Sequence, residues 1–189
     1  MCGIVGAIAD RNIVPVRVEG LRRLEYRGYD SAGVAVIDDK KNIGLCRAVG
    51  KVAELDEKLE KDPLTGKIGV AHTRWATHGG VTEANAHPHL SGGRVAVIHN
   101  GIIENFQPIK DEMLAEGYVF DSETDTEVAA HLVHHYLKQG LDLVAAVGKA
   151  VKRFEGAYAL LVVDAEDPDR IVVSRVASPL VIGLGEGEN

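Results

Sequence analysis

The sequence is poor in cysteine, in basic residues and in long apolar runs, and each shortage counts against a class of protein. Its only cysteines, Cys2 and Cys46, form no Cys-x-x-Cys pair, which argues against a disulfide scaffold or a common zinc module. Lys and Arg (21) are outnumbered by Asp and Glu (28), and the net charge of −7 argues against binding to nucleic acids or anionic membranes. Charges interrupt every apolar run well before the roughly 20 residues of a membrane helix, and the first residues lack the basic leader of a signal peptide. We expect a soluble, cytoplasmic protein.

The 189 residues, 46% of them apolar, are enough for one domain with a continuous core. Short β-rich runs and amphipathic helices come in pairs rather than in strict β-α-β order, which favours an α+β fold of layered antiparallel sheets. The expected strands are Ile4–Ala9, Gly33–Ile37, Ile43–Arg47, Ile68–His72, Val95–His99, Tyr158–Val163 and Ile171–Ser174, with an apparent last strand at Leu180–Ile182. The expected helices are Val14–Tyr26, Val52–Lys61, Ile109–Glu116, Thr126–Lys138 and Leu143–Phe154.

Local signals mark one helix and two irregular segments. Thr124 followed by Glu127 forms a capping box, which predicts a helix start, and Gly140 predicts its end. Residues 26–33 and 72–93 fit neither helical nor strand periodicity; both are polar, and the second is rich in glycine and histidine and holds the only tryptophan. Long irregular segments inside a compact domain are more often functional than idle.

Cys2 directly follows the initiator methionine, and removal of Met1 would leave a thiol and an α-amine on one residue. The ordinary pKa of an α-amine is ~7.7–8.0 and that of a cysteine thiol is ~8.5, so a proton can pass between the two groups at little cost in free energy. This pairs a nucleophile with its base, as covalent catalysis requires. A small buried hydrophobe at a strand start is the structural alternative for Cys2, but Gly3 and Gly6 indicate that something approaches this strand closely. Cys46, in an apolar strand, is interpreted as ordinary packing.

Six segments, in the same order and spread along essentially the whole chain, resemble the class II glutamine amidotransferases. They are Cys-Gly-Ile-Val-Gly at 2–6, Leu-Arg-Arg-Leu-Glu-Tyr-Arg-Gly-Tyr-Asp-Ser-Ala-Gly at 21–33, His-Thr-Arg-Trp-Ala-Thr-His-Gly at 72–79, Asn-Ala-His-Pro-His at 85–89, His-Asn-Gly-Ile-Ile-Glu-Asn at 99–105 and Ser-Glu-Thr-Asp-Thr-Glu at 122–127. The resemblance implies an N-terminal-nucleophile (Ntn) hydrolase fold, a four-layer αββα sandwich with two antiparallel sheets.

The resemblance also implies roles for ten residues. For catalysis it implies Cys2, Asn100, Gly101 and Arg27; for binding of the substrate it implies Arg74, Trp75, Thr77, His78, His87 and Asp125. Cys2 would attack the side-chain amide of glutamine, release ammonia and carry a thioester that water hydrolyses to glutamate. Asn100 and Gly101 would form the oxyanion hole, whose donors are typically worth ~100- to 1,000-fold in rate each.

Residue chemistry agrees with these roles but leaves alternatives. Arg74 offers a bidentate fork for the α-carboxylate of glutamine. An Asn-Gly pair such as Asn100-Gly101 is also typical of a tight hairpin turn. Asp125, the partner implied for the α-ammonium, would stabilise a helix N-terminus whatever the function.

The segment variants are similar to the family branch that makes glucosamine 6-phosphate from fructose 6-phosphate, rather than to branches acting on phosphoribosyl pyrophosphate, glutamate or asparagine. The resemblance implies that residues 1–189 are a glutaminase domain whose final strands lie beyond Asn189. Fructose 6-phosphate would bind to isomerase domains outside this sequence, and the full-length enzyme would be a homodimer. No cofactor, metal or nucleic-acid partner is expected.

Three other hypotheses stay open on the sequence. Eight histidines, including His87 and His89 around Pro88 and the helical trio His131, His134 and His135, invite a metallohydrolase. No His-Glu-x-x-His or comparable ligand spacing occurs, however, and the trio is better interpreted as a polar face or a part-buried packing patch. A noncatalytic glutamine-binding module is a second alternative. The third is another class II amidotransferase with a different acceptor for the ammonia.

Overall fold

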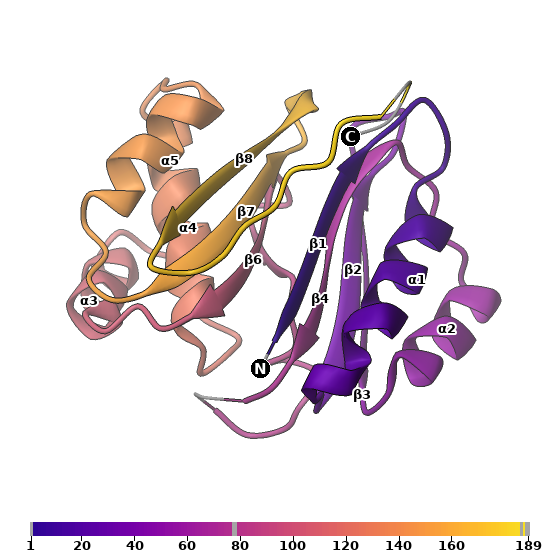
Figure 1. The fold of residues 1–189 in the computed structure, drawn as a ribbon. Helices are drawn as coiled ribbons and strands as arrows, with labels where there is room; N and C mark the ends of the chain where they lie inside the picture. Colours follow the sequence, from indigo (N-terminus) through magenta and orange to yellow (C-terminus); the bar gives the residue numbers. More distant parts are fainter. Residues whose placement is uncertain (1, 77–78, 186, 188–189) are drawn as a thin grey trace.

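The computed structural model, which describes residues 2–76, 79–185 and 187, has two antiparallel sheets packed face to face with helices on both outer sides (Figure 1). Sheet one has the order β1-β4-β2-β3, with β1 Gly3–Ile8, β2 Ser31–Ile37, β3 Ile43–Val49 and β4 Ile68–Arg74. Sheet two has the order β5-β6-β7-β8, with β5 His89–Ser91, β6 Val95–Gly101, β7 Tyr158–Asp164 and β8 Asp167–Val176. The predicted α+β architecture of two antiparallel sheets is therefore confirmed.

The helices form the two outer layers. On sheet one lie α1 Val14–Leu24 and α2 Val52–Lys61, with the short 3-10 turn η1 Glu25–Arg27 after α1; on sheet two lie α3 Phe106–Ala115, α4 Asp125–Lys138 and α5 Leu143–Val151. No helix in the described ranges is long and apolar enough to cross a membrane.

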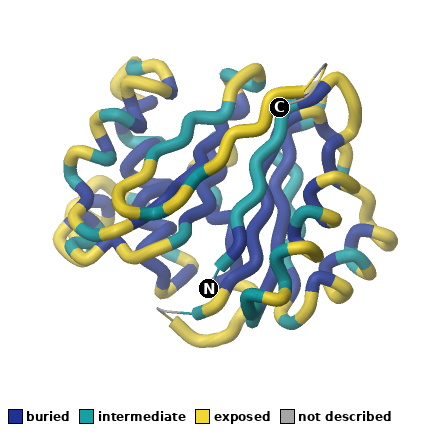
Figure 2. The backbone as a smooth tube through the Cα atoms, in the orientation of Figure 1, coloured by how far each residue is buried: buried dark blue, intermediate teal, exposed yellow. Residues whose placement is uncertain are grey.

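Three apolar layers hold the sandwich together. The residues of β2 alternate between two of them: Val34 and Val36 pack toward α1 and α2, whereas Ala35 and Ile37 pack into the layer between the sheets. A third layer lies between sheet two and α3–α5. The central strands are buried along their length, while the outer helices expose one side (Figure 2). A strand that is apolar on both faces is thus explained by its place between a helical layer and a second sheet.

Most of the predicted elements exist, but their ends and two of the strands differ. The three-residue strand β5 was not expected, and β8 is longer than the predicted Ile171–Ser174. The strand predicted at Leu180–Ile182 is wrong: these residues follow β8 without entering either described sheet, and Val181 and Ile182 are 90% and 68% exposed. A short apolar run becomes a strand only when a neighbouring strand supplies hydrogen bonds.

The capping box at α4 is half confirmed. The Thr124 side chain accepts from the backbone N–H of Glu127 at 3.4 Å, as predicted. The Glu127 carboxylate, however, accepts from the backbone N–H groups of Asp121 and Ser122 rather than from that of Thr124. The acidic side chain therefore fixes the loop that leads into α4, not only its first turn.

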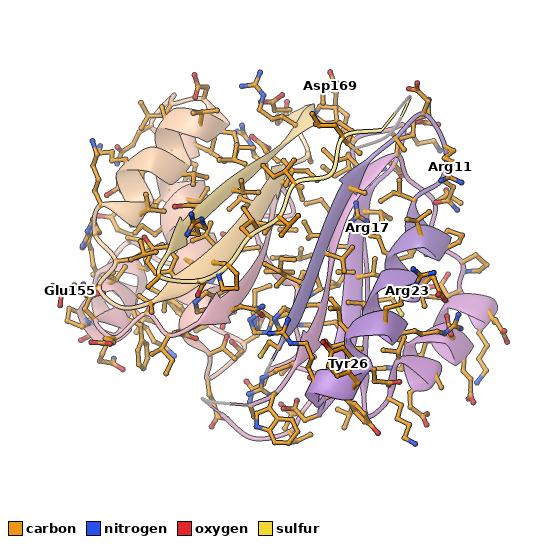
Figure 3. All side chains as sticks on the ribbon, viewed as in Figure 1. Arg11, Arg17, Arg23, Tyr26, Glu155 and Asp169 are labelled. Atoms are coloured by element: carbon orange, nitrogen blue, oxygen red, sulfur yellow. The ribbon has the colours of Figure 1, made fainter. Side chains whose placement is uncertain are left out.

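Arg17 of α1 supports β1, the strand that follows Cys2. Its side chain is fully buried between α1 and β1 (Figure 3) and donates to the backbone carbonyls of Val5, at 3.2 Å, and Ala7. Burial lowers the pKa of this guanidinium to about 9. Because β1 is an edge strand of sheet one, Arg17 satisfies carbonyl groups that would otherwise be open to a further strand.

Candidate active site

Cys2 directly precedes β1, and its thiol contacts the backbone of Trp75. The N–H of Trp75 donates to Sγ at 3.2 Å, and the carbonyl oxygen of Trp75 lies 3.5 Å from Sγ. Burial is the largest influence on the thiol and raises its pKa, while the Trp75 N–H lowers it. Cys2 is therefore held mainly as a thiol and would need a base to react as a nucleophile.

The glycines beside Cys2 are explained by packing inside the molecule. A Cβ on Gly3 would lie 2.7 Å from Oγ1 of Thr73, and one on Gly6 would lie 2.5 Å from Cδ2 of Leu161 in sheet two. The close approach predicted for this strand therefore comes from other strands of the same domain. Cys46 lies in β3 and packs against the apolar layer under α1 and α2.

Asn100 and Gly101 approach Cys2 from the opposite sheet. They are the last residues of β6 and pair with Ala159 and Tyr158 of β7, so the Asn-Gly sequence is not a hairpin turn. Nδ2 of Asn100 donates to the carbonyl oxygen of Cys2 at 3.2 Å. Gly101 has φ +116°, and a Cβ there would lie 2.1 Å from the carbonyl oxygen of Ala157. Only glycine fits this close approach without strain.

Arg74, the last residue of β4, is a buried cation at the pocket. Its guanidinium donates to the carbonyl oxygens of Gly80 at 3.0 Å and Gly79 at 3.3 Å, and it lies 3.5 Å from Oδ1 of Asp30. Asp30 also accepts from the backbone N–H of Ala76 and from the Ser31 hydroxyl. This carboxylate thus ties the loop before β2 to the segment that follows β4.

Asp125 comes to the pocket from sheet two's helical layer, as the first residue of α4. Its Oδ2 accepts from the backbone N–H of Ile103 at 2.8 Å and lies 3.9 Å from Nδ1 of His99. The residue is 4% exposed. Its carboxylate is therefore held by the segment after β6, in addition to its place at the positive end of a helix.

Four buried histidines, His72, His87, His89 and His99, lie close together at the pocket, and we call them the histidine cluster; His87 and His99 line the pocket, whereas His72 and His89 do not. The rings of His72 and His87 stack with centroids 4.2 Å apart, and His89 packs edge-on against His87. Burial lowers the pKa of His72 and of His89 to about 3 each, and that of His87 well below its ordinary value. These three rings are neutral at physiological pH. The hydroxyl of Thr126 links His87, at 2.6 Å, to His99, at 3.0 Å.

The residues from both sheets surround one small pocket. It is lined by Cys2, Arg74, Trp75, His87, His99, Gly101, Thr124, Asp125 and Thr126. Its cavity volume is about 20 Å³, which accommodates roughly one water molecule. A larger ligand would therefore require lining side chains to move; Trp75 is one of these and is 54% exposed.

The structure brings most of the ten predicted site residues together. Six of them line the pocket: Cys2, Arg74, Trp75, His87, Gly101 and Asp125. Asn100 lies beside it and contacts Cys2. Arg27, in η1, is half-buried and is not among the lining residues. Thr77 and His78 lie outside the described residues.

Sequence reasoning missed Asp30, His72, His99 and Thr126. His72 and Arg74 are two residues apart in one strand, so period-2 alternation places them on the same face, and this signal was available. The same spacing links His99 to Gly101 in β6. Asp30 directly precedes β2, and Thr126 lies in the first turn of α4. Neither position indicates from the sequence that the residue belongs to the site.

The three histidines of α4, His131, His134 and His135, make packing contacts, as the sequence predicted. His131 of α4 contacts the Ser91 hydroxyl at 2.8 Å and the carbonyl oxygen of Val119 at 3.0 Å. His134 contacts the Tyr118 hydroxyl, and His135 contacts Gln139. In the part of the chain that the structure describes, no three His, Cys, Asp or Glu side chains are grouped as ligands for a metal ion.

Comparison with known proteins identifies the family. Residues 72–187 match the glutamine amidotransferase domain. The whole chain is 62% identical to glutamine–fructose-6-phosphate aminotransferase (isomerizing) of Pseudomonas aeruginosa and 61% identical to the protein of that name from Idiomarina loihiensis. In both cases the chain spans 31% of the relative's length.

Solved structures share the fold. Glutamine phosphoribosylpyrophosphate amidotransferase from B. subtilis superimposes with a TM-score of 0.73 at 24% identity, over 87% of this chain and 35% of that one. A structure described as the allosteric regulatory enzyme of purine biosynthesis gives 0.74 at 26% identity, over 87% of this chain and 36% of that one. The predicted Ntn-hydrolase fold is therefore confirmed. The chain belongs to the glutamine amidotransferase family and is homologous to part of glutamine–fructose-6-phosphate aminotransferase.

Proposed function

We propose that this protein hydrolyses the side-chain amide of L-glutamine to glutamate and ammonia, with Cys2 as the nucleophile. The observation that carries the proposal is the meeting of Cys2, from sheet one, with Asn100 and Gly101, from sheet two. A thiol beside two potential oxyanion donors is the arrangement that acyl transfer requires.

The first half of the reaction forms a thioester. Once Met1 is removed, the α-amine of Cys2 takes the thiol proton, and Sγ attacks the amide carbon of glutamine. The amide oxygen becomes an oxyanion that accepts from Nδ2 of Asn100 and from the N–H of Gly101. The tetrahedral intermediate collapses when the ammonium of Cys2 returns its proton to the leaving nitrogen, which departs as ammonia.

The second half consumes one water molecule. The α-amine is neutral again and takes a proton from the water molecule while the oxygen of that water attacks the thioester carbonyl. The same two donors stabilise the second oxyanion. Collapse of this intermediate breaks the carbon–sulfur bond, and the proton on the amine returns to Sγ. Glutamate leaves, and the free thiol is restored.

Two buried charges at the pocket suit a free amino acid. Arg74 would bind the α-carboxylate of glutamine, and Asp125 would bind its α-ammonium. We assign supporting contacts to Arg27, Trp75, Thr77, His78 and His87. Recognition of both charges would exclude ligands that lack a free amino-acid head.

We further propose that the ammonia serves the synthesis of glucosamine 6-phosphate from fructose 6-phosphate. The support is the name carried by relatives that are 62% and 61% identical over the whole chain. Binding of fructose 6-phosphate, a homodimeric assembly and a cytoplasmic location belong to this proposal. Transfer of ammonia to another acceptor is the competing possibility.

The proposed function is tested by moving the α-amine of Cys2, the proposed base, while keeping its thiol, the proposed nucleophile. A variant with one extra residue retained before Cys2 keeps the thiol but places the amine elsewhere, and we expect it to lose glutaminase activity. Cys2→Ala should also be inactive, and both variants should keep the thermal stability of the wild type. Mass spectrometry should show that active wild type lacks Met1 and that 6-diazo-5-oxonorleucine labels Cys2. Full activity in protein that retains Met1 would refute the terminal-amine mechanism.

A further inference from the structure

The ring of His72 connects the two sheets directly behind the oxyanion donors. His72 lies in β4 of sheet one and is 0% exposed. Its Nε2 lies 3.0 Å from the carbonyl oxygen of His99 and 3.1 Å from Oδ1 of Asn100, both in β6 of sheet two. Because both neighbours accept hydrogen bonds, Nε2 carries the ring proton and donates to them.

The Asn100 amide is consequently held at both ends. Its Oδ1 faces the Nε2–H of His72, and its Nδ2 faces the carbonyl oxygen of Cys2 at 3.2 Å. A flipped amide would set its NH2 group against the ring N–H and its oxygen against the Cys2 carbonyl. Both contacts would then repel, so the observed orientation is strongly favoured.

We propose that His72 is a positioning residue for the oxyanion hole, because its ring directs the NH2 group of Asn100 toward the nucleophile. The inference rests on the proposed glutaminase function and assigns a role to a residue outside the ten discussed above. His72 does not line the pocket, so it acts through Asn100 and not on the substrate.

The surroundings of the ring preserve this geometry. His87 stacks on His72 with an interplanar angle of 22°, and Thr126 holds His87 by a contact of 2.6 Å. Burial keeps His72 neutral, with a pKa of about 3, so its single ring proton stays on Nε2 across the working pH range. Among the described residues, Nδ1 of His72 has no hydrogen-bond partner. This unsatisfied acceptor lowers the stability of the fold, and an apolar side chain at position 72 would avoid that cost. The Nε2–H donor that the histidine supplies to Asn100 explains why a histidine suits this position.

The experiment compares two substitutions at position 72 in the purified protein. His72→Leu removes the donor while keeping an apolar side chain, and we expect kcat to fall about 10- to 100-fold with KM for glutamine within about threefold, because only stabilisation of the oxyanion is lost. His72→Gln retains an N–H donor at a similar reach and should recover most of that loss.

A matched control lies in the same cluster. His89 is equally buried and neutral, but its Nε2 contacts the Thr124 hydroxyl at 2.9 Å instead of Asn100. His89→Leu should therefore lower the melting temperature while leaving kcat within about twofold of wild type. If His89→Leu and His72→Leu lower kcat equally, general loss of packing is the cause and the positioning role is refuted.

A double-mutant cycle isolates the link through Asn100. In an Asn100→Ala background, His72→Leu should lower kcat by no more than about twofold, because the group that it positions is absent. If the double variant loses kcat by the product of the two single losses, the inference is overturned. It is also overturned if His72→Leu leaves kcat unchanged, or if His72→Gln has a kcat as low as that of His72→Leu. These results leave the proposed function intact. Wild type that does not hydrolyse glutamine would overturn both.

Discussion

Acidification should destabilise this protein because His72, His87 and His89 of the histidine cluster are buried without charge. His72 and His89 have pKa values of about 3 in the folded state, lowered first by burial, against about 6.5 when unfolded. The unfolded chain therefore binds more protons between these values. The stabilisation is complete above pH ~6.5 and is lost as the pH falls toward ~3.

The magnitude follows from the linkage relation. On unfolding, each of these two histidines takes up almost no proton at about pH 7.5 but nearly one at about pH 5, and integration over this range lowers the free energy of unfolding by roughly 2 kcal/mol for each. Together they contribute roughly 4 kcal/mol, a large part of the ~5–15 kcal/mol typical of a domain. His87 acts in the same direction. Glu127 adds a further loss below about pH 4.5. Burial opposes ionisation of its carboxyl, but nearby His131, with Nε2 3.7 Å from Oε1, and hydrogen bonds from Ser122 and Asp121 bring its pKa to about 2.

Urea denaturation followed by circular dichroism at these two pH values measures the effect directly. His89→Gln serves as the internal comparison, because it removes one titrating ring and keeps a polar group near Thr124. We expect this variant to lose about 2 kcal/mol less than wild type on acidification. A wild-type change below about 1 kcal/mol at constant m-value would show that the cluster is not held neutral, and the reasoning would fail.

Two further predictions concern glycines. Gly101→Ala should lower glutaminase activity about 100-fold or more and destabilise the fold by about 1–3 kcal/mol, since φ is +116° and the new Cβ would strike the Ala157 carbonyl; near-normal kcat and melting temperature would contradict this. Gly33→Ala should destabilise the fold by a similar amount, because the new Cβ would lie 2.2 Å from the carbonyl oxygen of His87. Gly148→Ala in α5 should instead stabilise the fold by roughly 0.5–1 kcal/mol, because no atom lies within 4 Å of the new Cβ and alanine favours a helix. Equal effects of these two alanines in calorimetry would show that the contact with His87 does not constrain Gly33.

The strands and helices with clear periodicity were predictable from the sequence, and those that depend on a distant neighbour were not. β2 and β4 carry enough apolar residues on both faces to be recognised as buried strands. β5, with the sequence His-Leu-Ser, is three residues long and pairs with β6, whereas the entirely apolar Leu180–Ile182 lacks a described pairing partner. Local composition does not contain that difference.

The site shows the same limit. Resemblance to the family identified Cys2, Arg74 and Asp125, and the structure gathers them at one pocket. The role of His72 follows from the approach of β4 to β6 across the two sheets, which no spacing in the sequence reveals. Similarly, Asn100-Gly101 has the composition of a turn, and only its pairing with β7 shows that it ends a strand.

The placement of Cys2 on one sheet and of Asn100 on the other has a consequence for the whole sandwich. The distance between the proposed nucleophile, Cys2, and the proposed oxyanion donor, Asn100, depends on the thickness of the apolar layer between the sheets. Ala35, Ile98 and Leu161 contribute to that layer. Side chains far from the pocket thus set the spacing that the proposed reaction needs, and a misplacement of about 1 Å in that layer would lower the rate while both sheets remain intact. On gradual heating, catalytic activity should therefore be lost before β-structure, which makes turnover a more sensitive gauge of inter-sheet packing than any spectroscopic measure of secondary structure.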